Sequence, residues 1–288
     1  MESNMNYQGE DLILITGAPG TRWSASIQSI SSHPDINLSD HTEERMYERT
    51  AEYEDGKKAG IGWHRGVYFG PDHEFGHTFD NLEAWTKEEL LTEFKKAFSD
   101  WEPGIKIIKS HWFAYSLDHL HKCFPKAKII AYYLPDELCL QWWQVVGGFN
   151  ISYPHYDWYK TNERMLKQIK IENACSIKFA AEMGVEFKRY NTLADIHTEL
   201  DLDPSKVDYL DVWNRDPKIQ TLAEQLADGN WNLETDEGKI EYTKHMLNDR
   251  SKANMAMIYN PNKTYNNQII KQDLIDSTVK VINKYGRE

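Results

Sequence analysis

The sequence predicts an α/β fold, in which a mostly parallel β-sheet forms the middle of three layers and helices flank it. Apolar runs rich in β-branched residues alternate with segments of helical periodicity from residue 12 to residue 200, which is typical of strands joined by helical crossovers. The chain has 288 residues, 40% of them hydrophobic, so it can bury a sizeable core. No internal repeat or low-complexity linker divides it, and we expect one domain over residues 1–288.

The charge balance and the cysteines exclude several classes of protein. The formal net charge is −12 and no basic stretch carries interleaved aromatic residues, so neither a nucleic acid nor a membrane surface is expected as a partner. The three cysteines, Cys123, Cys139 and Cys175, form no CxxC pair and suit a reducing compartment. Residues 1–11 are polar and acidic, unlike a signal peptide, and no apolar run reaches membrane-spanning length. We therefore expect a cytoplasmic protein.

The first predicted element is a buried strand formed by four apolar residues, Leu12–Ile15. A loop with two glycines follows at Thr16–Thr21, and from Arg22 onward apolar residues recur three and four positions apart, which predicts a helix. The backbone N–H groups of a glycine loop and the positive end of a helix together form a cradle for an anion. This order predicts a site for a phosphorylated ligand; a strand-to-helix turn without a ligand is the alternative.

The same loop fits the generic phosphate loop G-x-x-x-x-G-K-[ST] only in part. Over residues 17–24, Gly17 and Ser24 match, whereas Trp23 stands where the lysine should reach the β- and γ-phosphates. Ordinary nucleoside triphosphate hydrolysis is therefore poorly supported. A nucleotide-dependent phosphotransferase, which would bind a triphosphate with magnesium, is one alternative function.

Between residues 31 and 80 the chain is mostly polar, with a short helical pattern at 42–53. His73 and His77 have a spacing that suits a metal if they lie on a helix, but Pro71 and Gly76 favour a loop, and no carboxylate or cysteine set completes the ligands. We expect no metal. The loop at 61–80, rich in aromatic residues and histidines, and the aromatic stretch at 149–159 are expected on the substrate side of the site.

Helices and strands alternate through the middle of the chain. Thr86 and Glu89 form a capping-box pattern at the start of an amphipathic helix over Thr86–Asp100, and the turn Pro103-Gly104 precedes a strand at Ile105–Ile108. The next predicted elements are a helix at 116–123, a strand at 127–133, a helix at 135–144 and a helix at 162–183.

Gly184 is expected to end the long helix at 162–183. Val185–Tyr190 is predicted as a fourth strand, and Leu193–Leu200 as a helix. From Asp201 the chain is acidic and polar. Helices are predicted there at 218–226, 238–248 and 272–284.

Three segments, taken in order, resemble a known family. GTRW at 20–23 follows the first strand, KSH at 109–111 ends the second, and the third strand runs through FPKAKIIAYYLP at 124–135 towards Glu137 and the tryptophan pair 142–143. These resemble the signatures of the sulfotransferases, P-loop-fold enzymes that move a sulfuryl group from 3′-phosphoadenosine 5′-phosphosulfate to a hydroxyl or amine. The resemblance covers about residues 11–200 and leaves residues 201–288 unaligned.

The resemblance implies a P-loop-type sheet, that donor, and a small molecule or saccharide as acceptor. It implies that His111 is the general base, at the carboxyl end of its strand, with Lys109 directed to the same side. Trp23 matches the family tryptophan that stacks on adenine. The loop residues expected around the 5′-phosphosulfate are Gly17, Ala18, Pro19, Gly20, Thr21, Arg22, Trp23 and Ser24. Without the resemblance, His111 is interpreted as a strand-end cap and Trp23 as a core residue.

The sequence departs from the family at three positions whose side chains contact the charged groups of the donor. The loop lysine of the family falls on Ala18, and Arg22 is the expected substitute because a guanidinium can fork onto phosphate or sulfate oxygens. The arginine and serine that hold the 3′-phosphate fall on Tyr133 and Gln141, which can donate hydrogen bonds but carry no charge. Each lost charged contact costs about 1.5–3 kcal/mol of binding. A non-catalytic relative that keeps the scaffold for binding is therefore a further alternative.

Overall fold

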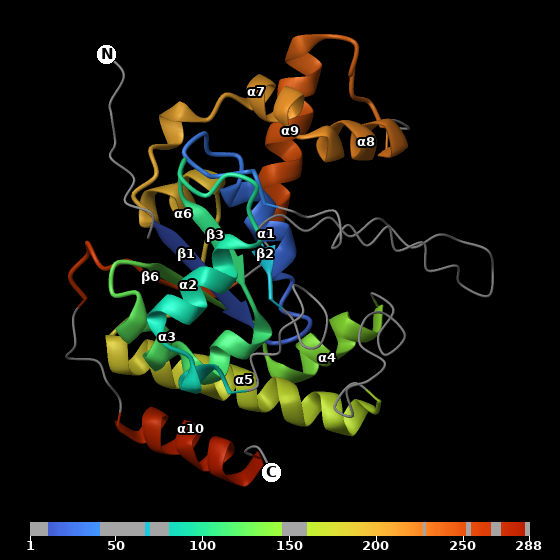
Figure 1. Ribbon diagram of the computed structural model, residues 1–288. Coiled ribbons are helices and arrows are strands. Elements are labelled where there is room, and N and C mark those ends of the chain that lie inside the picture. The colour runs from blue at the N-terminus through green and yellow to red at the C-terminus, as the bar shows by residue number, and fades with distance from the viewer. Residues whose placement is uncertain are drawn as a thin grey trace.

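The fold is built on one mixed β-sheet. The computed structural model (Figure 1) describes residues 11–40, 67–69, 81–145, 160–226, 229–251, 255–265 and 272–285. Its strands are ordered β2-β3-β1-β4-β6-β5. The central strand β1 (Leu12–Gly17) runs parallel to β3 (Lys106–Lys109) and β4 (Lys128–Tyr133), and β2 (Val67–Tyr68) runs parallel to β3. The predicted α/β class with a mostly parallel sheet core is confirmed.

One edge of the sheet is antiparallel, which the sequence did not predict. β6 (Met255–Tyr259) pairs antiparallel with β4, and β5 (Lys188–Arg189) pairs antiparallel with β6. The predicted fourth strand at 185–190 is thus corrected to two residues that do not join the parallel part. Its first residue still belongs to the end of a helix, because the N–H of Val185 donates to the carbonyl of Ala180.

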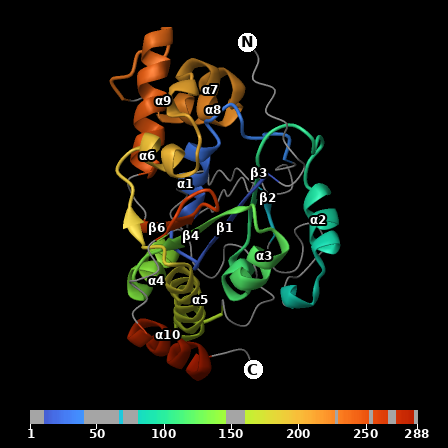
Figure 2. The same ribbon diagram turned by 90° about the vertical axis from the view of Figure 1, so that its left-hand side faces the viewer.

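Helices cover both faces of the sheet. Successive strand residues point to opposite faces, so Leu12 and Leu14 enter one core, whereas Ile13 and Ile15 enter another. In Figure 2, α1 (Trp23–Ile30) and α6 (Leu193–Glu199) lie on one side of the sheet, and α2 (Lys87–Lys95) and α3 (Leu117–Cys123) on the other. All six residues of β1 are buried, as expected for a strand covered on both faces.

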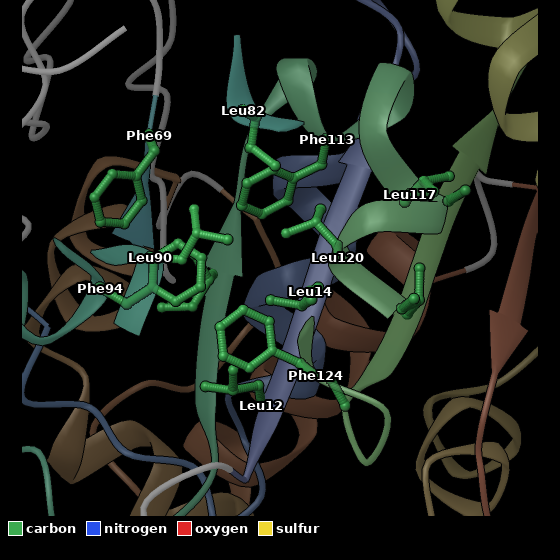
Figure 3. Packing of buried hydrophobic residues seen from close by; sticks show 14 of the residues in the cluster. Leu12, Leu14, Phe69, Leu82, Leu90, Phe94, Phe113, Leu117, Leu120 and Phe124 are labelled. Carbon is green, nitrogen blue, oxygen red and sulfur yellow. The ribbon is translucent and has the colours of Figure 1, made fainter. Parts of the chain in front are cut away.

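The larger core is rich in aromatic side chains. Figure 3 shows Leu12 and Leu14 of β1 facing Phe124 and Leu120, with Phe94 beside them. The rings of Phe94 and Phe124 have centroids 5.7 Å apart. Burying several such side chains, each worth about 1.5–3 kcal/mol relative to exposure, fixes α2 and α3 on this face.

Local signals set the helix ends. Thr86 and Glu89 form the predicted capping box, but α2 ends at Lys95 rather than at residue 100, because the following residues turn and Phe98 forms an isolated β-bridge with Asp40. The long helix α5 (Asn162–Met183) is capped by the side chain of Thr161 and ends at Gly184, whose φ is 67°. A left-handed glycine at this position is the predicted helix stop.

The C-terminal part adds helices around a small core of its own. The predicted helices appear as α8 (Pro217–Leu226), α9 (Asp236–Ser251) and α10 (Gln272–Tyr285), and α7 (Tyr209–Arg215) was not predicted. Trp213 of α7 packs edge to face on Tyr242 of α9, with ring centroids 6.1 Å apart. α10 packs along the outer side of α5 (Figure 1).

Among the described helices, none is both long and apolar enough to span a membrane. The helical pattern predicted at 42–53 lies outside the described residues.

Two buried histidines lie where α1 and α6 meet. His33 and His197 are both fully buried, and their rings meet edge to face with centroids 5.5 Å apart. Burial, together with the neighbouring His33 ring, lowers the pKa of His197 to about 4, and burial also lowers the pKa of His33. In the unfolded chain a histidine ring has a pKa of about 6.5. Between the folded pKa of His197 and the pKa of an unfolded histidine, the unfolded state binds more protons than the folded state. The free energy of unfolding therefore falls as the pH drops from about 6.5 towards about 4.

We expect the free energy of unfolding to fall on acidification by a His197-dependent amount, about 2 kcal/mol between pH 7.5 and pH 5. Urea unfolding of the wild type and of His197→Gln at both pH values measures it. The variant should be less stable at pH 7.5 but should lose less stability on acidification. His245→Gln, which changes a half-exposed ring on α9, is the matched control. Equal losses in the wild type and in His197→Gln would contradict the assignment.

Candidate functional site

The candidate site lies where β1 and β3 end side by side. The two strands are parallel neighbours, with Ile15 opposite Lys109, so the loop after Gly17 and the segment Ser110-His111 emerge at the same edge of the sheet. Open α/β sheets bind ligands at the carboxyl ends of their strands, next to the point where the strand order reverses. The fold therefore brings the predicted loop and the predicted base together.

His111 contacts the loop directly. Its Nδ1 lies 2.5 Å from the carbonyl oxygen of Gly17, and the ring of Trp23 faces it with centroids 4.5 Å apart. Because a carbonyl oxygen only accepts, Nδ1 carries the hydrogen and donates it, which leaves the lone pair of the neutral ring on Nε2. The hydroxyl of Thr16 donates to the backbone carbonyl of His111 at 3.4 Å.

Burial keeps this imidazole neutral. Its side chain is 12% exposed, and desolvation lowers the pKa of His111 to about 4; the Gly17 hydrogen bond opposes this shift and the Lys109 charge adds to it. Lys109, the last residue of β3, is itself fully buried. At neutral pH the ring is therefore uncharged and Nε2 is able to accept a proton.

A buried carboxyl group also reaches this cluster, from α5. Glu172 is 1% exposed, and its Oε2 lies 3.7 Å from Nδ1 of His111. The side-chain amide of Gln168, one turn earlier, donates to Oε1 of Glu172 at 2.5 Å and also to the hydroxyl of Tyr115. Sequence reasoning missed Glu172. Polar residues at 168, 172 and 176 recur four apart, which is typical of a solvent-facing stripe, yet this stripe is buried.

The glycine loop is held firmly between helices. The Ala18 carbonyl accepts hydrogen bonds from both the N–H and the hydroxyl of Thr21, at 3.1 and 2.8 Å. Ala18 packs in a small apolar cluster with Cys139 of α4 (Asp136–Val145) and with Met165 and Ile169 of α5. Ala18 and Pro19 are buried, so the loop can offer a ligand backbone groups rather than these two side chains.

Arg22 is placed by an aromatic partner on α4. It precedes α1 in the left-handed conformation, with φ 63°, and its guanidinium carbon lies 4.2 Å from the centre of the Trp142 ring. Partial burial lowers its pKa, but arginine stays protonated in proteins. Trp23, next in sequence, is 7% exposed and belongs to the core with Ile27 and Ile30. The first turn of α1 also includes Ser24.

The two positions expected near a 3′-phosphate do not form a cationic site. Tyr133 ends β4 and its ring packs near Phe187, with centroids 5.5 Å apart. Burial and the carboxylates of Asp136 and Glu137 raise its pKa, and the same carboxylates would repel a phosphate there. Gln141 is exposed on α4, one residue before Trp142.

Part of the predicted acceptor side lies outside the described residues. This holds for His73 and His77, for the loop at 61–80 apart from residues 67–69, and for the aromatic stretch at 149–159. Within the described ranges, no group of three metal-ligating side chains comes together.

Comparisons of the chain with models of protein families, with curated proteins and with solved structures found no match.

The loop makes one contact that tolerates only glycine. Gly20 has φ 89°, and a Cβ added to it would lie 2.1 Å from the carbonyl oxygen of Cys139. We expect Gly20→Ala to cost about 3 kcal/mol or more of unfolding free energy, from left-handed strain and from overlap with α4. Gly184→Ala, at the left-handed end of α5, measures the conformational cost in the same denaturant experiment. An equal loss in the two variants would show that α4 does not hold the loop.

Proposed function

We propose that the protein is a divergent sulfotransferase of P-loop-type fold, which moves a sulfuryl group from 3′-phosphoadenosine 5′-phosphosulfate to a hydroxyl or amine of a small molecule or saccharide. The observation that carries the proposal is the hydrogen bond between His111 and the Gly17 carbonyl. It joins the candidate base to the candidate phosphate loop, two segments 94 residues apart in the chain. A cytoplasmic location is part of the proposal, supported by the acidic composition and the sparse cysteines.

Sulfuryl transfer, like phosphoryl transfer, depends on positioning and on electrostatic stabilisation of charge on the equatorial oxygens. The acceptor loses a proton as its oxygen or nitrogen attacks in line. Nε2 of His111 is the atom that takes this proton, because Nδ1 is already engaged as a donor to Gly17. The neutral ring is in the correct protonation state across the physiological pH range.

Arg22 supplies the positive charge that the loop would otherwise lack. A guanidinium binds phosphate and sulfate oxygens through two parallel N–H bonds. Its contact with Trp142 holds the side chain at the start of α1, where the helix dipole also favours an anion. Lys109 adds charge below the site, close enough to lower the His111 pKa.

A non-catalytic binding protein on the same scaffold is the second candidate. It is favoured by the surroundings of Tyr133, where Asp136 and Glu137 stand in place of cations, and by the exposed position of Gln141. This candidate predicts that a nucleotide or sulfated ligand binds but that no acceptor in a broad screen is sulfated.

The first test is calorimetric titration with adenosine 3′,5′-bisphosphate, the expected product of the donor. We expect binding to the wild type, weakened about 10-fold to 100-fold in Arg22→Ala through loss of a charged contact, and partly recovered in Arg22→Lys. Arg189→Ala, on the exposed edge strand β5, should bind like the wild type. Absence of binding at millimolar concentration would remove the donor assignment and leave the fold unaffected.

The second test separates catalysis from binding. We expect His111→Ala to lower turnover by roughly 10²-fold to 10⁴-fold, the range for loss of a general base, while the affinity for the bisphosphate stays nearly unchanged. Radiolabelled donor and an acceptor panel measure turnover, and titration measures affinity. His245→Ala, on the surface of α9, is the matched control. Unchanged turnover in His111→Ala would exclude this residue as the base.

A further inference from the structure

The carboxyl group of Glu172 is held in one orientation relative to the His111 ring. Its Oε1 accepts from the amide of Gln168, so its Oε2 is the oxygen that faces Nδ1 of His111, at 3.7 Å. Both Glu172 and Gln168 lie on α5 and are buried, at 1% and 7% exposure. Because protein interiors are close-packed, this burial leaves the two side chains little room to change rotamer.

From this geometry we propose that Glu172 is a positioning residue for His111, acting through Gln168 to keep an acceptor oxygen facing Nδ1 and so to keep the lone pair on Nε2. The kinetic part of this inference rests on the proposed function, whereas the tautomer part does not. Gly17 and Glu172 then form two acceptors on the same side of the ring. An acceptor oxygen on that side disfavours the tautomer that carries its hydrogen on Nε2. In that tautomer the lone pair of Nδ1 would face a lone pair of the oxygen.

In the proposed reaction the proton of the acceptor moves to Nε2 of His111. In the proposed reaction the acceptor O–H bond breaks and an Nε2–H bond forms, while the acceptor oxygen's electron pair makes the new S–O bond. The old S–O bond of the donor breaks, and its electron pair leaves on the phosphate oxygen of adenosine 3′,5′-bisphosphate. The imidazolium formed lies near the Lys109 ammonium, which opposes it, and Oε2 of Glu172 faces its Nδ1 at 3.7 Å.

The structure predicts an informative effect for Glu172→Gln. In this variant the Gln168 amide continues to donate, so the new carbonyl oxygen stays at the Oε1 position and the new NH₂ takes the place of Oε2. An N–H donor would then face Nδ1, which favours the tautomer with the hydrogen on Nε2. Such a ring presents a donor where the reaction needs an acceptor.

Reversing the two side chains gives the complementary variant. In Gln168→Glu with Glu172→Gln, the carboxylate at 168 accepts from the NH₂ at 172. The carbonyl oxygen at 172 is thereby turned towards Nδ1. The double variant therefore restores an acceptor at this place and keeps the same net charge as the wild type.

The test measures the tautomer of His111 in the full-length protein, using ¹⁵N chemical shifts of its ring at pH 7.5, and the kinetics of sulfuryl transfer. We expect a wild-type ring protonated on Nδ1, a shift towards Nε2 protonation in Glu172→Gln, and a return in the double variant. Turnover should fall by about 10²-fold to 10⁴-fold in Glu172→Gln, as when a triad carboxylate is replaced by its amide, with the donor KM little changed. Glu182→Gln, an exposed site on the same helix, should leave both unchanged.

Each outcome decides one question. Ring shifts in Glu172→Gln identical to those of the wild type overturn the positioning role, whatever the activity. A changed tautomer with no sulfuryl transfer by the wild type supports the positioning role and refutes the proposed function. If Glu172→Gln does not fold, the double variant decides: Nδ1 protonation supports the proposal, and Nε2 protonation overturns it.

Discussion

The hydrogen bond between His111 and the carbonyl of Gly17 is the contact on which the site depends. It forms because β1 and β3 are parallel neighbours in register, so that their carboxyl ends emerge together. The bond favours the tautomer with the hydrogen on Nδ1 and satisfies a loop carbonyl with a buried partner. A buried carbonyl without such a partner costs free energy, so loop and ring stabilise each other.

Helix α4 connects the loop to the rest of the site. Its backbone comes so close to Gly20 that no side chain fits there, and one turn later Trp142 lies against the Arg22 guanidinium. The same helix therefore determines the shape of the loop and the position of the cation that follows it. Because α4 begins directly after β4, its placement follows from the sheet.

Buried ionisable groups are concentrated at this edge of the sheet in a chain whose net charge is strongly negative. Lys109 ends β3, His111 begins the 3-10 helix His111–Ser116 that follows, and Glu172 lies on α5; little of the three side chains is exposed. Burying ionisable groups is costly unless they are hydrogen-bonded or paired. A buried histidine with a perturbed pKa beside other ionisable side chains is typical of functional sites. Glu172 belongs to a polar stripe of α5 that lies inside the protein.

Local signals in the sequence determined much of the fold. Apolar runs specified β1, β3 and β4, Thr86 and Gly184 set helix ends, and the order of strands and helices specified the α/β class, because each signal depends only on residues within a few positions. The order of strand, glycine loop and helix predicted an anion site at residues 17–22, and the resemblance to the sulfotransferases pointed to His111. Tertiary structure alone decided that β6 separates β4 from β5, that Ala18 packs under α4, and that Glu172 turns inward to His111. These depend on contacts between segments tens of residues apart or more, and such contacts form only when whole elements pack.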